Sequence, residues 1–215
     1  MATPNNIDPK DIRAHWAEYQ GDKYVDGWAS LWDKYDNLPW DRGFPNPALE
    51  DTLVQRAGTI GKPITQDGQR RKALVPGCGR GVDVLLLASF GYDAYGLEVS
   101  ATAVDACKKE EKENPSWYRV RDEKAGKGKV TFVQGDFFDD TWLKEIGVPR
   151  NGFDIIYDYT ISYNDKGLVN ADPLREPSKA GLERVAYWQP ERTHAVGKGE
   201  NGVIHDRVSI WRRRD

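Results

Sequence analysis

Residues 72–100 read KALVPGCGRGVDVLLLASFGYDAYGLEVS, and this stretch decides the fold class. The apolar run 72–75 predicts a short strand, which the glycine-rich turn 76–81 ends. Apolar residues return over 82–87, as in a helix that is buried on most of its surface. After a turn at Gly91, a second strand is predicted, with Glu98 at its end. Strand, glycine loop, helix and strand in this order predict the first half of a doubly wound α/β fold.

Length and composition limit the class of protein. A chain of 215 residues predicts a single domain spanning 1–215. The net charge of −3 argues against a protein that reads nucleic-acid backbones, and no apolar run approaches the ~20 residues of a membrane span. The polar, acidic N-terminus resembles neither a secretory signal nor a transit peptide. We therefore expect a soluble cytoplasmic protein without nucleic-acid or membrane partners.

The rest of the chain continues the α/β pattern. Helices are predicted over 9–20, 26–35, 48–58 and 81–90, and another begins after Ser100, a good N-cap. Strands are predicted within 72–76, 93–98, 129–139, 152–160, 182–191 and 203–213. Residues 161–181 are polar and punctuated by Gly and Pro, with no clear period. Cys78 and Cys107 form neither a metal-binding pattern nor a disulfide framework.

The glycine loop is spaced for a ligand other than a dinucleotide. Its G-x-G-x-G pattern (Gly77, Gly79, Gly81) differs from G-x-G-x-x-G, and the chain lacks a G-x-x-x-x-G-K-[ST] phosphate loop. Glu98 ends the second strand, where an α/β fold places a carboxylate to accept hydrogen bonds from ribose hydroxyls. The pattern therefore predicts a nucleoside site that does not require phosphate.

A second acidic position follows the third predicted strand. Asp136 and Phe137 lie in QGDFF, where an exocyclic amine and an adenine face would need an acid and an aromatic ring. The alternative is a glycine turn with solvated Glu98 and Asp136 side chains and no ligand.

These motifs resemble those of the class I S-adenosylmethionine-dependent methyltransferases. More narrowly, they resemble the thiopurine/thiol/halide methyltransferase group, especially its fungal members. The resemblance is carried by ALVPGCGRGVDVLLLASFGYDAYGLEVS (73–100), GDFF (135–138), FDIIYDYT (153–160), GWASLWDKYDNLPWDRGFPNPAL (27–49), VAYWQPERTHAVGKG (185–199) and DRVSIWRR (206–213). It covers most of the chain and is more specific than a lone glycine loop.

The resemblance implies a fold, a cofactor and a set of contacts. The fold would be a Rossmann-like core over 71–215, seven-stranded in the family, with a Trp-rich N-terminal cap over 1–70. S-adenosyl-L-methionine would be the cofactor. The cofactor contacts would be Trp28, Trp32, Trp40, Gly77, Gly79, Glu98, Asp136, Phe137 and Tyr159.

The implied reaction is methyl transfer to a small thiol or a halide-like anion. Such nucleophiles need little deprotonation, so neither a catalytic side chain nor a metal ion is expected. The enzyme would contribute alignment and water exclusion. Trp28, Trp32 and Trp40 fit a lid over a cationic sulfonium, although a Trp stripe at helical spacing also fits a plain core.

One departure from the family pattern concerns the acceptor side. After YDYT, Thr160 runs directly into ISYNDKGLVN, which resembles the segment just before the family's sixth strand. We expect the chain to lack an internal block there, and with it much of the acceptor pocket. A structure would then show either a chain break between Tyr159 and Gly167, or the fourth strand paired with the last strand or with a neighbouring molecule. The alternatives are a catalytically impaired cofactor-binding protein that acts through a partner and, more remotely, a nucleotide-sugar or dinucleotide enzyme.

Overall fold

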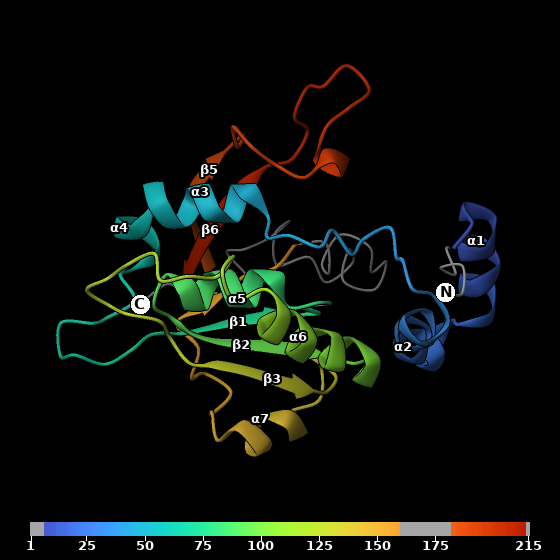
Figure 1. The fold of residues 1–215 in the computed structure, drawn as a ribbon, viewed down its shortest axis with the longest axis horizontal. Coiled ribbons are helices and arrows are strands. Elements are labelled where there is room, and N and C mark those ends of the chain that lie inside the picture. The colour runs from blue at the N-terminus through green and yellow to red at the C-terminus, as the bar shows by residue number, and fades with distance from the viewer. Residues whose placement is uncertain (1–6, 160–181, 214–215) are drawn as a thin grey trace. The chain divides into compact units, whose positions relative to one another are not determined.

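The computed structural model describes residues 7–159 and 182–213 (Figure 1). The chain divides into two compact units. Unit 1 comprises Met1–Phe44 and Pro63–Tyr157, and unit 2 comprises Pro45–Lys62 and Asp158–Asp215. Unit 1 thus joins part of the expected cap to the first four strands. A single domain with a boundary at residue 70 stays a prediction.

Unit 1 contains a parallel sheet. Its strands are β1 (Lys72–Pro76), β2 (Asp93–Glu98), β3 (Val130–Gln134) and β4 (Ile155–Ile156), in the order β3-β2-β1-β4. All three strand pairs are parallel. With α5 (Val82–Ser89) between β1 and β2 and α6 (Ala101–Glu113) between β2 and β3, this is the expected α/β Rossmann-like arrangement.

Helices cover both faces of this sheet. Figure 1 shows α5 and α6 over one face and α7 (Thr141–Ile146) on the other. On the α7 side, Trp142 and Leu143 pack against Leu74, Leu97 and Val133, which are all buried. Burial from both sides explains why β1 and β2 read as nearly continuous apolar runs.

Of the two N-terminal helices, the second packs onto α6 and the first packs onto the second. They are α1 (Pro9–Glu18) and α2 (Tyr24–Lys34), joined through η1 (Gly21–Lys23). Leu31 and Trp32 of α2 form a buried cluster with Ala103 of α6. Inside this pair of helices, Nε2 of buried His15 lies 2.8 Å from the Gly27 carbonyl oxygen, which gives that histidine a structural role.

Unit 2 combines two helices with a hairpin. Helices α3 (Pro47–Gln55) and α4 (Ala57–Ile60) come from the first half of the chain. The antiparallel strands β5 (Leu182–Trp188) and β6 (Val208–Arg213) come from its end and are linked through η2 (Ala195–Gly197). The Arg56 guanidinium lies 5.0 Å from the centre of the Trp188 ring, so a cation–π contact joins the helices to β5.

The six expected strands are all present, but β4 pairs over just two residues. Helix α7 was not predicted, because its six residues are too few to establish a helical period. Within the described residues, β4 pairs with β1, and β5 and β6 form a separate two-stranded sheet. The expected break or missing block after Thr160 falls in 160–181, outside the described residues.

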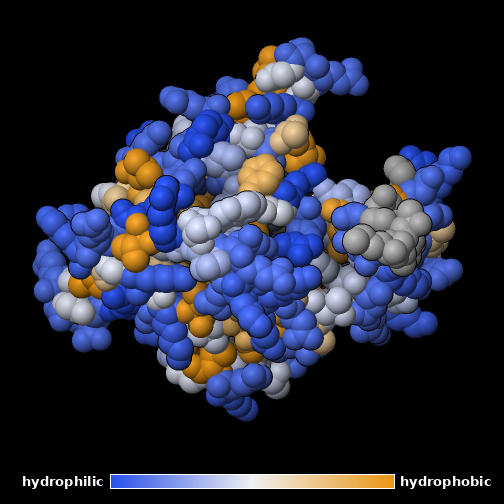
Figure 2. All heavy atoms as spheres, viewed as in Figure 1, coloured by the Kyte–Doolittle hydropathy of each residue, from blue (hydrophilic) through white to orange (hydrophobic). Residues whose placement is uncertain are grey.

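The face drawn in Figure 2 is mainly hydrophilic, with apolar side chains in small separate groups. Within 7–159 and 182–213, no helix has both the length and the apolar character that crossing a membrane requires.

The packing of α5 on the sheet can be tested at Gly96 in β2. A Cβ there would lie 2.8 Å from Cys78 Sγ, 2.8 Å from Phe132 Cδ1 and 3.0 Å from Val84 Cγ2. Gly96→Ala should therefore lower the free energy of unfolding by about 1–3 kcal/mol in urea titrations. Gly58→Ala is the control, because a Cβ there meets nothing within 4 Å. Equal stability of the Gly96→Ala and wild-type proteins would contradict this packing.

Candidate functional site

The glycine loop, defined as Gly77–Gly81, follows β1 directly. Gly77, Gly79 and Gly81 have φ angles of 55°, 53° and 78°, which are left-handed conformations that favour glycine. A Cβ at Gly81 would lie 2.6 Å from the Phe132 ring. Backbone conformation and packing thus account for the G-x-G-x-G spacing. The turn directs the Gly79 N–H towards the end of β2.

Glu98 is buried beside this loop, with 6% of its surface exposed. Its Oε2 accepts a hydrogen bond from the Gly79 N–H at 3.0 Å. Its Oε1 accepts from the N–H groups of Val99 at 2.8 Å and Ser100 at 3.2 Å. A carboxylate can accept about four hydrogen bonds, so Glu98 keeps capacity for a further donor. The end of β2 therefore presents an acid that is already held in one orientation.

The charge of Glu98 is costly in this position. Burial raises the pKa of Glu98, and the three backbone hydrogen bonds oppose that shift without cancelling it. The ionised form is therefore less favourable in the folded protein than in the unfolded chain. A hydrogen-bond donor that approached the free side of the carboxylate would stabilise the charge.

The expected tryptophans form one aromatic cluster. Trp32 is 8% exposed, and Trp28 and Trp40 pack against the cluster that contains it. The rings of Trp28 and Trp40 lie edge to face, with their centroids 5.2 Å apart. A Cβ at Gly79 would lie 3.4 Å from the Trp32 ring, so this ring reaches the glycine loop. Trp32 is at once part of the cap's core and a neighbour of the loop.

Asp136 and Phe137 follow β3 at the same edge of the sheet. The Gly135 N–H donates to the Glu98 carbonyl oxygen at 3.0 Å, which fixes this turn beside the end of β2. Asp136 is half-buried, and its Oδ1 accepts from the Phe138 N–H at 2.9 Å. Phe137 is 40% exposed. The structure thus gathers the glycine loop, Glu98 and the Asp136 turn at the carboxyl ends of three neighbouring strands.

Tyr159 belongs to unit 2. Its hydroxyl donates to Asp206 Oδ2 at 3.3 Å, and the Thr193 hydroxyl donates to the same oxygen. Its ring centroid lies 5.9 Å from that of His194, which is buried. His194 and Asp206 are 35 and 47 positions from Tyr159 in the sequence. A contact between Tyr159 and the cofactor stays a prediction.

Sequence reasoning missed an ion pair at the glycine loop. Arg80 Nε donates to both carboxylate oxygens of Asp41, at 3.1 and 2.8 Å, and a terminal nitrogen of Arg80 also donates to Asp41. The hydrogen bonds that Arg80 donates to Asp41 raise the pKa of Arg80. Since Asp41 directly follows Trp40, the pair ties the aromatic cluster's last member to the loop. The charged Arg80 inside the glycine motif hints at an ion pair, but no pattern in the sequence identifies Asp41 as its partner.

A hollow of about 320 Å³ adjoins this ion pair. It is lined by Asn37, Leu38, Asp41, Arg42, Gly43, Arg80 and Glu110. Neither Glu98 nor Asp136 is among these residues. The hollow is therefore beside the expected cofactor contacts and does not contain them.

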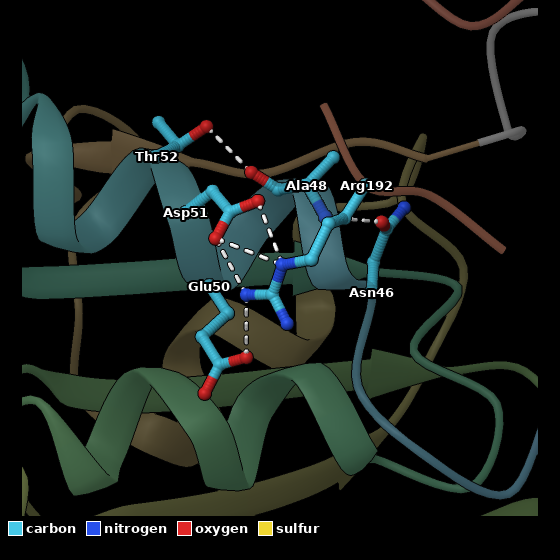
Figure 3. A network of polar contacts seen from close by, with 6 residues as sticks. All are labelled: Asn46, Ala48, Glu50, Asp51, Thr52 and Arg192. Carbon is cyan, nitrogen blue, oxygen red and sulfur yellow. Dashed lines mark hydrogen bonds and ion pairs between the residues drawn. The ribbon is translucent and has the colours of Figure 1, made fainter. Parts of the chain in front are cut away.

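Unit 2 has a polar network of its own, drawn in Figure 3. Arg192 points at the first turns of α3, where its Nε lies 3.1 and 3.0 Å from the two oxygens of Asp51 and its terminal nitrogen lies 3.0 Å from Glu50 Oε2. Asn46 caps the helix by accepting from the Ala48 N–H at 2.9 Å. Because these contacts all involve α3 or its N-cap, we assign the network a structural role. Within 7–159 and 182–213, no group of three or more His, Cys, Asp or Glu residues could hold a metal ion.

Comparison with protein families gives one match over most of unit 1. The model of the family described as "Thiopurine S-methyltransferase (TPMT)" matches residues 24–162, which is more than half of the chain. The match ends two positions after Thr160.

Two curated relatives carry related names. "Probable thiol methyltransferase 2" of Arabidopsis thaliana is 34% identical over 134 residues, covering 62% of this chain and 47% of that protein. "Thiocyanate methyltransferase 1" of Brassica oleracea is 31% identical over 137 residues, covering 63% and 47%. The chain thus spans about half the length of these relatives.

Solved structures also show likenesses. A protein titled "SAM-dependent methyltransferase from Anabaena variabilis ATCC 29413" is 12% identical with a TM-score of 0.47, and the match covers 99% of this chain and 98% of that one. A structure titled for the conversion of a disulfide bond into a thioacetal group during echinomycin biosynthesis is 24% identical with a TM-score of 0.47, covering 73% and 52%.

The raised pKa of Glu98 predicts how stability depends on pH. Below the unfolded-state pKa, Glu98 is neutral in both states; as pH rises through the folded-state pKa, ionisation costs the folded protein stability. The free energy of unfolding of the wild type, relative to that of Glu98→Gln, should therefore fall as the pH rises above the ordinary pKa of a glutamate side chain. Urea titrations at a series of pH values measure this difference. A relative stability that rises with pH would mean that the hydrogen bonds outweigh the burial.

Proposed function

The chain belongs to the thiopurine S-methyltransferase family, and on that premise we propose that it binds S-adenosyl-L-methionine and transfers the methyl group to a small thiol. The observation that carries the proposal is the buried Glu98 carboxylate, held against the glycine loop by the Gly79 N–H. An acid at this strand end suits the two hydroxyls of a ribose. The matched region 24–162 includes both residues.

The side chains around Glu98 fit an adenosyl group. Glu98 keeps capacity for a donor, which a ribose hydroxyl would supply. The half-buried Asp136 carboxylate would accept from an exocyclic amine, and the exposed face of Phe137 would stack on a purine. In addition, the Trp40 indole N–H is buried and has no hydrogen-bond partner among the described residues. A buried donor of this kind suits a polar ligand group, because leaving it unmatched costs free energy.

When bound, the cofactor supplies a methyl group on a sulfonium sulfur. That sulfur leaves as a neutral thioether when the methyl group is transferred, so no other leaving group is needed. The chain's residues would bind and orient it: Glu98 at the ribose, Asp136 and Phe137 at the base, and Trp28, Trp32 and Trp40 as a lid that excludes water. Alignment of the reacting atoms and removal of water are the contributions that this displacement needs. Aromatic faces also attract a cation.

The acceptor we propose is a small soft nucleophile. A thiol has an ordinary pKa near 8.5, so a useful fraction ionises without a protein base. The names of the relatives point to thiols and thiocyanate as acceptors of those proteins. We also propose a halide such as iodide as an acceptor, because it is a soft nucleophile and needs no deprotonation.

A second candidate is a protein that keeps the cofactor site but transfers methyl groups poorly. The observation in its favour is that the family match ends at residue 162 and that the chain spans about half of its relatives. The expected cofactor contacts, Tyr159 apart, all belong to unit 1. In this case activity would require a partner that completes the acceptor side.

Cofactor binding is tested by calorimetry with S-adenosylmethionine and S-adenosylhomocysteine. We expect binding of both and none of NAD or ATP. Glu98→Ala should weaken binding by about 1–3 kcal/mol, roughly 5- to 150-fold in Kd, because a charge-assisted hydrogen bond to the ribose is lost. Glu113→Ala, an exposed acid at the end of α6, is the matched control.

Asp136→Asn gives a second test that leaves the glycine loop untouched. Its effect should exceed that of Glu113→Ala, and thermal unfolding should show that all variants are folded. A folded wild-type protein that binds neither ligand would refute the proposal, as would unchanged affinity in both Glu98→Ala and Asp136→Asn.

The acceptor is tested by supplying thiols, hydrosulfide and iodide with the methyl donor. Methylated products should form from these nucleophiles but not from catechols or amines, and the rate with a thiol should rise with pH up to its pKa. Iodide is the control, because it does not titrate and its rate should stay flat where the thiol rate rises. A metal-dependent rate on an oxygen acceptor would contradict the assignment. Cofactor binding without any turnover would favour the second candidate.

A further inference from the structure

The two cysteines of the chain lie side by side at the glycine loop. Cys78 is within the loop and Cys107 is in the middle of α6, and their sulfur atoms are 3.9 Å apart. Both are free thiols, and Cys107 is fully buried. They are 29 positions apart in the sequence and meet because α6 packs behind the loop.

These thiols contact Gly79, the residue whose N–H group holds Glu98. Cys107 Sγ donates to the Gly79 carbonyl oxygen at 2.9 Å, while the Gly79 N–H donates to Glu98 Oε2 at 3.0 Å. The Cys78 sulfur also packs closely against β2, because a Cβ added at Gly96 would lie 2.8 Å from Cys78 Sγ. A change in either sulfur therefore reaches Glu98 through one residue.

We propose that Cys78 and Cys107 are an oxidisable site, at which a small disulfide converts the two thiols into a reversible disulfide bond that weakens cofactor binding. This inference rests on the proposed function, since the ligand affected is the adenosyl cofactor. The oxidant, a small disulfide, is the oxidised form of a small thiol, which is the class of acceptor that we propose. Thiol supply and enzyme activity would then be coupled at the cofactor loop.

The reaction balances as a thiol–disulfide exchange. The Cys78 thiolate attacks one sulfur of the small disulfide, which releases one thiolate and leaves a mixed disulfide on Cys78. The Cys107 thiolate then attacks the Cys78 sulfur and releases the second small thiolate. Two protons leave the cysteines and two electrons reduce the small disulfide to two thiols. A monothiol in excess reverses both steps.

Bond formation requires the loop to move. A disulfide holds its sulfur atoms about 2.05 Å apart, so the pair must close by roughly 1.9 Å. Cys107 is held within the 13-residue helix α6, whereas Cys78 lies in a turn. The turn should therefore shift towards the helix and carry Gly79 with it. Oxidation also removes the Cys107 S–H donor to the Gly79 carbonyl.

The rate of this reaction should be low at neutral pH. The hydrogen bond with Cys107, burial and the nearby Glu98 carboxylate raise the pKa of the Cys78 thiol, so the reactive thiolate is scarce. Oxidation should accelerate with rising pH. Because binding and oxidation act on the same loop, bound cofactor should also protect the pair from oxidation to the degree that oxidation weakens binding.

The test uses the full chain, reduced and then incubated with glutathione disulfide. Thiols are counted after denaturation, and peptide mapping identifies the bond. Because the chain has two cysteines, the loss of both thiols from a monomer without added glutathione mass identifies an internal disulfide. We expect the Kd for S-adenosylhomocysteine to rise at least ten-fold on oxidation and to recover with dithiothreitol. Cys78→Ser removes the thiol that attacks the small disulfide, so its Kd for S-adenosylhomocysteine should not change on the same treatment.

Three outcomes would overturn the inference: both thiols persist at pH 9, the disulfide forms between chains, or the internal disulfide leaves the Kd unchanged. A reduced protein that binds no cofactor would instead refute the proposed function. The disulfide itself would still be judged by the thiol count, and the loop movement by tryptophan emission, since the Trp32 ring lies against Gly79.

Discussion

The hydrogen bond from the Gly79 N–H to the Glu98 carboxylate is the contact on which the candidate site depends. It exists because β1 and β2 are adjacent and parallel, so that the chain leaves both strands at the same edge. The left-handed glycine loop then turns the Gly79 N–H back towards β2. Glu98 also accepts from Ser100, whose side chain caps α6 by accepting from the Ala103 N–H at 3.1 Å. One buried carboxylate thus fixes the loop, the strand end and the start of the next helix.

The sequence predicted this part of the molecule because its signals are local. Apolar runs, a glycine turn and an N-cap serine are each readable within a few residues, and the structure confirms β1, β2, α5 and the Ser100 cap. All three loop glycines have positive φ, whereas their spacing in the sequence indicates a nucleoside ligand, which stays a prediction. The position of Glu98 beside the loop follows from the topology of a doubly wound sheet, which the sequence also indicated.

The sequence could not supply contacts that depend on packing between distant elements. Arg80 and Asp41 are 39 positions apart, and Tyr159 and Asp206 are 47 apart, so no periodicity links either pair. Cys78 and Cys107 appeared unrelated for the same reason, although α6 brings their sulfurs to 3.9 Å. The apolar run around β4 predicted a longer strand than the two residues that pair, because propensity does not reveal where a pairing partner ends.

The strands and helices around Glu98 all belong to unit 1. Strands β1, β2 and β3 find their pairing partners within unit 1, and α5, α6 and α7 cover them from the same unit. Glu98, Asp136 and the glycine loop belong to these elements of unit 1 or adjoin them. Unit 2 is stabilised by contacts of its own, such as those from Arg192 to α3 and from Arg56 to Trp188. Under the proposed function, the expected cofactor contacts other than Tyr159 therefore lie in elements that pair and pack within unit 1.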